Sequence, residues 1–227
     1  MVFCIKFHKR RHEARTSMSV NPPPAIPDIV IGRLPLYLRA LRRLQQENKT
    51  VTSSHELGNR LDISSAQIRK DLSHFGGFGK QGTGYQIAFL VDKLQDVLHV
   101  NQEWMVVVVG AGNLGMAISH YRGFQDRGFR IAHLFDVSPQ KIGERIGEFV
   151  VQPVRSMRDI IRRENIKIAM LAVPAEDAQG VADQLVEAGV EAILNYAPIN
   201  IIVPPAVQIQ YIDPVTHLQH MTYYLAD

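Results

Sequence analysis

The sequence predicts an α/β protein with an N-terminal winged helix-turn-helix domain, then a Rossmann-type parallel-sheet domain and a C-terminal helix. Three observations predict this order. Two helix-start patterns stand close together in residues 53–67, a glycine-rich stretch follows at 76–84, and an apolar run leads into glycines at 106–115. The predicted divisions are an N-terminal extension (1–24), the winged-helix domain (25–86), a linker helix (87–103), the parallel-sheet domain (104–205) and a C-terminal segment (206–227).

Composition limits the classes of protein that fit. The chain has 227 residues, 46% of them hydrophobic, which is enough for two domains with cores. Its single cysteine, Cys4, excludes an internal disulfide framework and fits a reducing cytoplasm. The histidines are scattered without zinc spacing, so we expect no metal site. The longest apolar run is too short to span a bilayer and the N-terminus lacks a signal-peptide core, so we expect a cytoplasmic protein that does not enter a membrane.

Positive charge is concentrated in the first half of the chain. Residues 1–103 contain 15 Lys and Arg against nine Asp and Glu, whereas residues 104–227 contain ten against 13. The first 15 residues supply part of the excess, but residues 33–85 still hold nine basic against four acidic side chains. This asymmetry indicates that only the first half meets a polyanion. The alternative is a basic tail on an ordinary protein.

Three short helices are predicted before the glycine-rich stretch. Leucines repeat at helical spacing in residues 34–44 and predict the first helix. Ser53 stands three residues before Glu56, and Ser64 three before Gln67, which is capping-box spacing and predicts two further helix starts. Two short capped helices joined by a tight turn are typical of a helix-turn-helix motif.

The third predicted helix has the features of a DNA-recognition helix. Ile68, Leu72 and Phe75 would face the core, which leaves basic and polar side chains mainly on the other faces. In a helix-turn-helix this helix enters the major groove, and arginine can pair with a guanine edge. The glycine-rich stretch would form a two-stranded wing that carries a lysine to phosphate. The alternative is a solvated helix and a flexible hinge. The candidate DNA contacts are Ser65, Gln67, Arg69, Lys70, Ser73 and Lys80.

A dinucleotide fingerprint follows the strongest predicted strand. Gly110, Gly112 and Gly115 have G-x-G-x-x-G spacing between that strand and a helix. The first glycine permits the turn, the second lets the backbone approach a pyrophosphate, and the third lets the helix pack on the strand. Asp136 ends the next strand, where a carboxylate accepts ribose hydroxyls and repels a 2′-phosphate. The pattern therefore predicts NAD(H) rather than NADP(H), although Asp136 alone would also suit a strand-end turn.

Later strand ends predict the far wall of this site. Strands ending at Val173 and Asn195 would place apolar residues around the nicotinamide half, with no carboxylate nearby, and so disfavour the cationic ring of NAD⁺. Their alternative role is that of ordinary strand-to-helix turns. The candidate dinucleotide contacts are Gly110, Ala111, Gly112, Asn113, Leu114, Gly115, Asp136, Val137, Val173, Pro174, Asn195, Tyr196, Ala197 and Pro198.

No substrate domain follows the predicted nucleotide-binding unit. A dehydrogenase needs an acid or base and a substrate clamp, but residues 206–227 suggest only one terminal helix. We considered an NADH-responsive DNA-binding regulator, a small NAD-dependent oxidoreductase, and a CoA- or nucleotide-binding module. The missing domain argues against the enzyme, and Asp136 argues against the CoA module, so we expect a regulator without catalytic residues.

The chain resembles the Rex family of bacterial redox-sensing transcriptional repressors. The resemblance rests on SSAQIRKDLSHFGGFGKQGTGY (64–85), VGAGNLGMAISHYRGF (109–124), LFDVSP (134–139) and LNYAP (194–198). It implies a homodimer whose C-terminal helix is exchanged between subunits. It also implies a repressor that binds operator DNA when NADH is low and is released when NADH binds.

The resemblance also implies roles for single residues. Arg69 and Lys70 would contact operator DNA, and Tyr121 and Asp213 would meet across the dimer as a switch. His74 stands where the family usually has a tyrosine, and residues 1–24 lie outside the family pattern.

Overall fold

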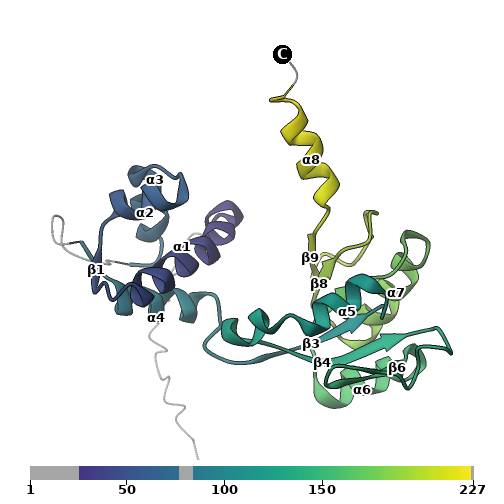
Figure 1. Cartoon of the computed structure of the whole chain (residues 1–227). Helices are drawn as coiled ribbons and strands as arrows, with labels where there is room; N and C mark the ends of the chain where they lie inside the picture. The colour runs from purple at the N-terminus through teal and green to yellow at the C-terminus, as the bar shows by residue number, and fades with distance from the viewer. Residues whose placement is uncertain (1–25, 77–83, 226–227) are drawn as a thin grey trace, which may run out of the picture.

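The computed structural model describes residues 26–76 and 84–225, which form a helical N-terminal domain and a C-terminal domain built on a parallel sheet (Figure 1). The helices are α1 (Asp28–Gln46), α2 (Ser54–Leu61), α3 (Ser65–Ser73), α4 (Ile87–Val97), α5 (Asn113–His120), α6 (Met157–Glu164), α7 (Ala175–Ala188) and α8 (Pro214–Thr222), with 3-10 turns at Arg122–Arg127 and Val154–Ser156. The strands are β1 (Val51–Thr52), β2 (Tyr85–Gln86), β3 (Trp104–Val109), β4 (Phe129–Asp136), β5 (Arg145–Ile146), β6 (Phe149–Pro153), β7 (Ile168–Leu171), β8 (Ala192–Asn195) and β9 (Gln208–Tyr211). No helix in these described ranges is long and apolar enough to cross a membrane.

Both predicted helix starts of the helix-turn-helix are confirmed. The Ser53 hydroxyl accepts the backbone N–H of Glu56 at 3.1 Å, and the Ser64 hydroxyl accepts that of Gln67 at 3.2 Å. Between them Asp62, the residue that caps the C-terminus of α2, lies in the left-handed region, with φ 55°. The side chains of Glu56 and Gln67 do not complete a capping box, because each is bonded elsewhere.

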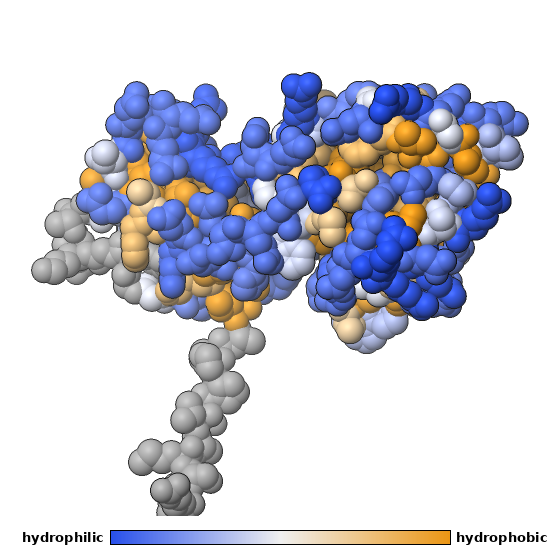
Figure 2. Space-filling view, turned by 90° about the horizontal axis from the view of Figure 1, so that it is seen from below, coloured by the Kyte–Doolittle hydropathy of each residue, from blue (hydrophilic) through white to orange (hydrophobic). Residues whose placement is uncertain are grey.

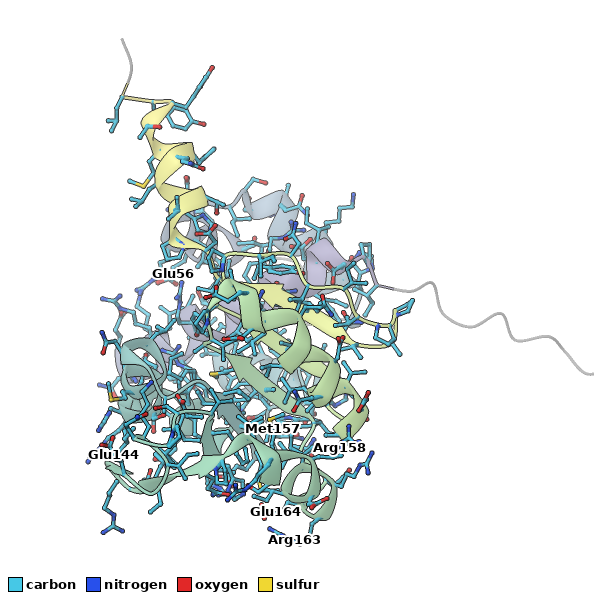
Figure 3. All side chains as sticks on the ribbon, turned by 90° about the vertical axis from the view of Figure 1, so that its right-hand side faces the viewer. Glu56, Glu144, Met157, Arg158, Arg163 and Glu164 are labelled. Carbon is cyan, nitrogen blue, oxygen red and sulfur yellow. The ribbon has the colours of Figure 1, made fainter. Side chains whose placement is uncertain are left out.

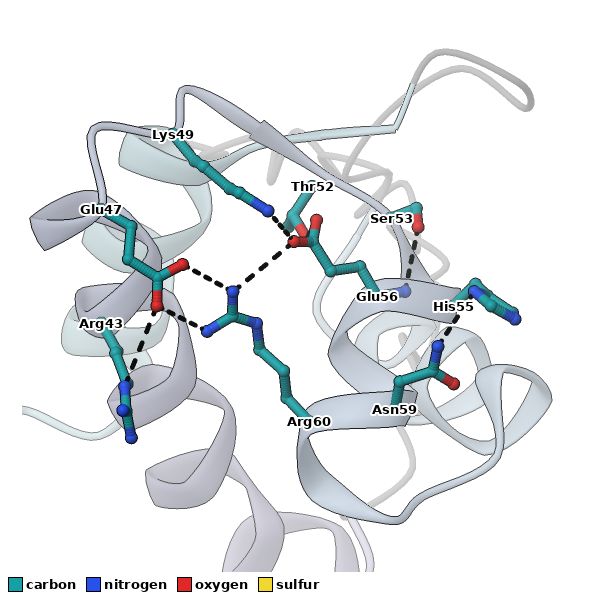
Figure 4. Close-up of polar contacts among 9 residues, drawn as sticks. All are labelled: Arg43, Glu47, Lys49, Thr52, Ser53, His55, Glu56, Asn59 and Arg60. Carbon is teal, nitrogen blue, oxygen red and sulfur yellow. Dashed lines mark hydrogen bonds and ion pairs between the residues drawn. The ribbon is translucent and has the colours of Figure 1, made fainter.

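Exposed ion pairs join the end of α1 to α2 (Figure 4). Arg60 donates two hydrogen bonds to Glu47, at 2.8 and 2.6 Å, and Lys49 pairs with Glu56. Such solvated pairs contribute little stability individually. They connect α2 to the end of α1 above the core that these helices share.

One hydrophobic core holds all four helices of the N-terminal domain. Leu34 of α1, Leu57 of α2 and Ile68 of α3 are fully buried together with Leu90 and Leu94 of α4. Helix α4 therefore shares the core of the N-terminal domain, and the predicted boundary at residue 86 cuts through this core.

A two-stranded antiparallel sheet lies at the base of the glycine-rich stretch. Val51 pairs with Gln86, and Thr52 with Tyr85. The described strand that follows the glycines thus pairs with a strand that precedes α2, a partner that the sequence pattern did not indicate. The predicted wing tip, with Lys80, lies outside the described residues.

The C-terminal domain contains a seven-stranded sheet in the order β5-β6-β4-β3-β7-β8-β9. All neighbouring pairs are parallel except β5 with β6. Val107 and Val109 of β3 face a core with α6 and α7, whereas Val106 and Val108 face a core with α5. Figure 3 shows α6, along which Met157, Arg158, Arg163 and Glu164 are labelled, beside α7. Both faces of β3 are therefore buried, as its unbroken apolar run predicts.

The C-terminal segment was predicted to be one helix, but the structure adds a strand before it. Strand β9 pairs in parallel with β8, from Gln208 opposite Ala192 to Tyr211 opposite Asn195. Its side chains are largely exposed because it lies at the edge of the sheet. A four-residue edge strand with two glutamines lacks the apolar signal of the central strands.

A buried carboxylate fixes α3 against α1. Asp71 of α3 is fully buried and accepts Arg33 Nε at 2.6 Å, Arg33 Nη2 at 2.8 Å and the Tyr37 hydroxyl at 2.6 Å. It also accepts Nε2 of Gln67 at 2.6 Å. Burial alone would raise the pKa of Asp71, but these hydrogen bonds outweigh burial and hold the pKa below the ordinary aspartate value.

We expect Asp71→Asn to destabilise the protein at neutral pH and much less in acid. A lowered folded-state pKa contributes stability above the unfolded pKa, about 4, and that contribution is lost as pH falls through the folded value. The cost at pH 7 should be about 3 kcal/mol, at the low end for a broken buried pair because Arg33 is partly exposed. Denaturant unfolding at several pH values measures this.

Asp62→Asn is the matched control, because Asp62 is an exposed aspartate of the same motif. It should show little effect at either pH. An equal cost of Asp71→Asn at pH 7 and pH 3 would contradict an ionised, stabilising Asp71.

Candidate functional site

The three fingerprint glycines have different surroundings. A Cβ at Gly110, where φ is +101°, would lie 2.2 Å from the Ala172 carbonyl oxygen. A Cβ at Gly115 would lie 1.8 Å from the carbonyl oxygen of Gly110. A Cβ at Gly112 would meet no atom within 4 Å. Gly110 and Gly115 are therefore required by the turn and by helix packing, whereas Gly112 leaves open space for a ligand, as the fingerprint predicts.

That space belongs to a cavity of about 750 Å³ at the carboxyl ends of β3, β4 and β7. The volume is within the ordinary range for cofactor sites. The predicted contacts that line it are Gly110, Gly112, Asn113, Leu114, Asp136, Val137, Val173, Pro174 and Tyr196. The lining residues that sequence analysis missed include Lys141, Val154, Glu176, Asp177, Gly180 and Gln184. Most of these lie on α7 or in loops, so they have no short-range motif that would mark them.

Asp136 links the end of β4 to the glycine loop. One carboxylate oxygen accepts the backbone N–H of Ala111 at 2.7 Å, and the other accepts that of Ser138 at 2.8 Å. Lys141 Nζ lies 3.3 Å away. Burial would raise the pKa of Asp136, but the two backbone N–H groups and Lys141 outweigh it and lower the pKa. Asp136 is thus an anion that joins the glycine loop to the turn after β4.

The structure corrects one expectation about the cavity wall. No carboxylate was expected near Val173 and Pro174, but Glu176 and Asp177 in the first turn of α7 line the same cavity. Both side chains are exposed, and their negative charge is favourable in the first turn of a helix because of the helix dipole. The cavity is therefore not purely apolar.

Other predicted contacts lie in the loop after β8, where they make hydrogen bonds within the protein. The Asn195 side chain is fully buried, donates to the carbonyl oxygens of Ala197 and Ile199, and accepts the N–H of Ala197. It closes the loop after β8 and, with Ala197 and Pro198, is not among the lining residues of the cavity. Of this loop only Tyr196 lines the cavity, and burial raises its pKa.

The two predicted switch residues are not among the residues that line this cavity. Tyr121, half-exposed after α5, packs edge-on against Phe124 with ring centroids 5.1 Å apart. Asp213 caps α8 by accepting the N–H of Val215 at 2.9 Å. In the described part of the chain no hydrogen bond joins them.

The predicted DNA contacts on α3 differ in exposure. Arg69 and Lys70 are exposed, and Arg69 Nη1 donates to the Ser54 hydroxyl at 3.0 Å. Ser73 is exposed and donates to the Lys70 carbonyl, whereas Ser65 is half-buried. Gln67 is bonded to Asp71. The basic side chains are thus accessible, while two of the polar ones already have partners within α3.

Two protein families match separate parts of the chain. The family described as "Putative DNA-binding protein N-terminus" matches residues 25–73. The family described as "CoA binding domain" matches residues 101–199. These matches divide the chain between the same two domains that the fold contains.

Longer similarities identify the whole chain. Proteins named "Redox-sensing transcriptional repressor Rex" from Chloroflexus aggregans (strain MD-66 / DSM 9485) and Roseiflexus sp. (strain RS-1) are 53% and 54% identical over 200 residues. These alignments cover 88% of this chain and 94% and 91% of the relatives. A crystal structure of RSP, a Rex-family repressor, in complex with NAD⁺ and operator DNA superposes with a TM-score of 0.84 at 38% identity, covering 88% and 92% of the two chains. RSP in complex with NADH superposes with a TM-score of 0.81 at 35% identity, covering 88% and 94%. At this identity and coverage, the chain belongs to the Rex family of redox-sensing transcriptional repressors.

Proposed function

We propose that this protein is a repressor that binds operator DNA through α3 and NAD(H) through the cavity beside Gly112. It binds DNA when NADH is low and is released by NADH. The observation that carries this proposal is that one chain joins an accessible basic helix to a cavity with an open fingerprint glycine. The family is one of transcriptional repressors and not of enzymes, which removes the oxidoreductase alternative. A repressor of this kind acts in the cytoplasm, where the bacterial DNA lies.

The residues of the cavity fit a dinucleotide. Open space at Gly112 admits a pyrophosphate to the start of α5. Oδ2 of Asp136 accepts from the Ala111 N–H and from Lys141, whereas Oδ1 accepts only the Ser138 N–H and keeps capacity for a ribose hydroxyl. When bound, NAD(H) supplies a nicotinamide ring that is neutral in the reduced form and cationic in the oxidised form.

Discrimination between the two forms must come from the ring, because both share the rest of the molecule. Glu176 and Asp177 give the open cavity an acidic rim that tolerates a cationic ring. Closure would remove the cationic ring and these carboxylates from water, and this loss of solvation can exceed their attraction, so a closed state selects NADH. A ligand shifts an equilibrium only by its differential affinity for the two states. Closure around the neutral ring is therefore the step that we couple to DNA release.

The proposal includes a homodimer formed by exchange of α8. This helix extends away from the body of the chain (Figures 1 and 3) and exposes Val215, Leu218 and Met221, each to more than half. A hollow of about 1270 Å³ between the domains has apolar walls that include Phe129 and basic walls that include Arg39. Figure 2 shows apolar surface on both domains. An apolar helix with Asp213 at its start complements this hollow, so we assign it to α8 of a second copy.

Gly112→Ala should separate cofactor response from DNA binding. The added methyl meets no protein atom but enters the cavity, so the fold stays intact while NADH affinity falls about ten-fold or more, which is about 1.4 kcal/mol. Titration of NADH and NAD⁺ against an operator complex measures this. Gly32→Ala is the control, since its methyl also meets no atom and lies in α1. If wild-type protein stays on operator DNA at saturating NADH, the proposed response is wrong.

Leu218→Asp should produce a monomer that has lost tight operator binding. It places a charge in the middle of the apolar face of α8, and a single winged helix reaches only one half-site. Sedimentation and operator binding are the measurements. Gln219→Asp adds the same charge to a polar position of α8 and should stay dimeric. A dimeric Leu218→Asp protein would exclude α8 as the dimer contact.

Tyr121→Phe should leave NADH binding largely intact but reduce the difference between NADH and NAD⁺ in DNA release. The change removes only the hydroxyl that we pair with Asp213 of the other subunit in the DNA-binding state. Operator release by each cofactor is compared with that of Tyr223→Phe, which removes another exposed hydroxyl. A full wild-type difference in Tyr121→Phe would mean that the switch does not use this pair.

A further inference from the structure

The amide of Gln67 has a fixed direction in the recognition helix. Its Nε2 donates to Oδ1 of Asp71 at 2.6 Å. Asp71 is fully buried and is held from α1 by Arg33 and Tyr37. Three of the four donors to the Asp71 carboxylate therefore come from α1, and the fourth is Nε2 of Gln67.

The chemistry of Asp71 decides which end of the Gln67 amide faces it. An ionised carboxylate is an acceptor only, so it takes the NH₂ group and repels the carbonyl oxygen. This pairing leaves only one orientation for the amide of Gln67. The Oε1 atom of Gln67 is consequently turned away from Asp71.

Gln67 belongs to the part of α3 that corresponds to the base-reading half of a recognition helix. It is half-buried in the N-terminal half of α3, one turn before the exposed Lys70. Side chains in that half of a recognition helix meet base edges in the major groove. In that groove the exocyclic amino groups of adenine and cytosine are the donors that an oxygen acceptor can read.

We infer that Asp71 is a positioning residue that makes Gln67 present Oε1 as a fixed acceptor for the amino group of one adenine or cytosine in the operator. This inference rests on the proposed operator binding and adds a specificity-determining pair to it. A free glutamine can turn its amide to suit a donor or an acceptor. An amide held by Asp71 presents only its Oε1 acceptor to DNA, and it loses less conformational entropy on binding than a free glutamine does.

The experiment measures coupling between single protein and base groups. The wild type first selects its operator from a randomised duplex library. Adenines are then replaced one at a time by purine, and cytosines by pyrimidin-2-one, which lack the amino group. Removal of the amino group that Gln67 reads should weaken wild-type binding about ten-fold. Gln67→Met should bind the intact operator about ten-fold more weakly than the wild type does, and removal of that amino group should not weaken its binding further.

Two further variants separate positioning from general stability. Tyr37→Phe removes one donor from Asp71 but keeps Gln67 bonded, so it should keep the full sensitivity to the amino group. Asp71→Asn replaces one carboxylate oxygen by an NH₂ group, so the amide of Gln67 is free to turn. This variant should lose the sensitivity to the base amino group while still binding DNA through its basic side chains. If Asp71→Asn does not fold, the comparison of Gln67→Met with Tyr37→Phe carries the test.

The outcomes distinguish this inference from the proposed function. A wild type that selects no sequence overturns the proposed function. A wild type that selects an operator in which no amino group is coupled to Gln67 overturns only the inference. A 7-deaza purine lacks the N7 acceptor of the base. The inference is also wrong if the effect of Gln67→Met disappears on a 7-deaza purine operator but on no operator that lacks an amino group, because Gln67 would then donate from Nε2 to a base acceptor.

Discussion

The close backbone packing at the end of β3 is the constraint on which the C-terminal domain depends. Gly110 passes the Ala172 carbonyl and Gly115 passes the carbonyl of Gly110 at distances that exclude a Cβ. Because of this packing α5 begins directly above the central strand, and its N-terminal N–H groups face the carboxyl edge of the sheet. The cavity, the position of Asp136 and the open side of Gly112 all follow from that turn.

A second constraint organises the N-terminal domain. Helix α3 is short, and apolar contacts from Ile68 and Leu72 alone would allow it to rotate against α1. The bidentate contact of Arg33 with Asp71 sets that rotation, since a planar guanidinium and a carboxylate meet well in one geometry. Desolvation makes such a buried pair a weak source of stability but a strong source of orientation when every donor and acceptor is satisfied.

These two units are coupled in our proposal through surfaces that a single chain leaves uncovered. The hollow between the domains combines apolar and basic walls, and α8 offers an apolar face that begins with an acid. A helix placed between the domains would sense their relative orientation, and the spacing of two recognition helices depends on that orientation. A change at the cofactor cavity can then alter the fit to successive major grooves without any contact between cofactor and DNA.

The sequence by itself determined the parts whose signals are local. Two serine caps, the apolar run of β3 and the spacing of three glycines predicted the helix-turn-helix and the nucleotide fold, because each depends on neighbours within a few residues. Features that depend on residues far apart in the sequence were decided only by the tertiary structure. It joined α4 to the N-terminal core, paired β1 with β2, and added β9 to the sheet. It also gave Asn195 a loop-closing task, brought Glu176 and Asp177 into the cavity, and turned the amide of Gln67 toward a carboxylate held by Arg33. Burial and hydrogen-bond direction are properties of surroundings assembled from the whole chain, and no local pattern encodes them.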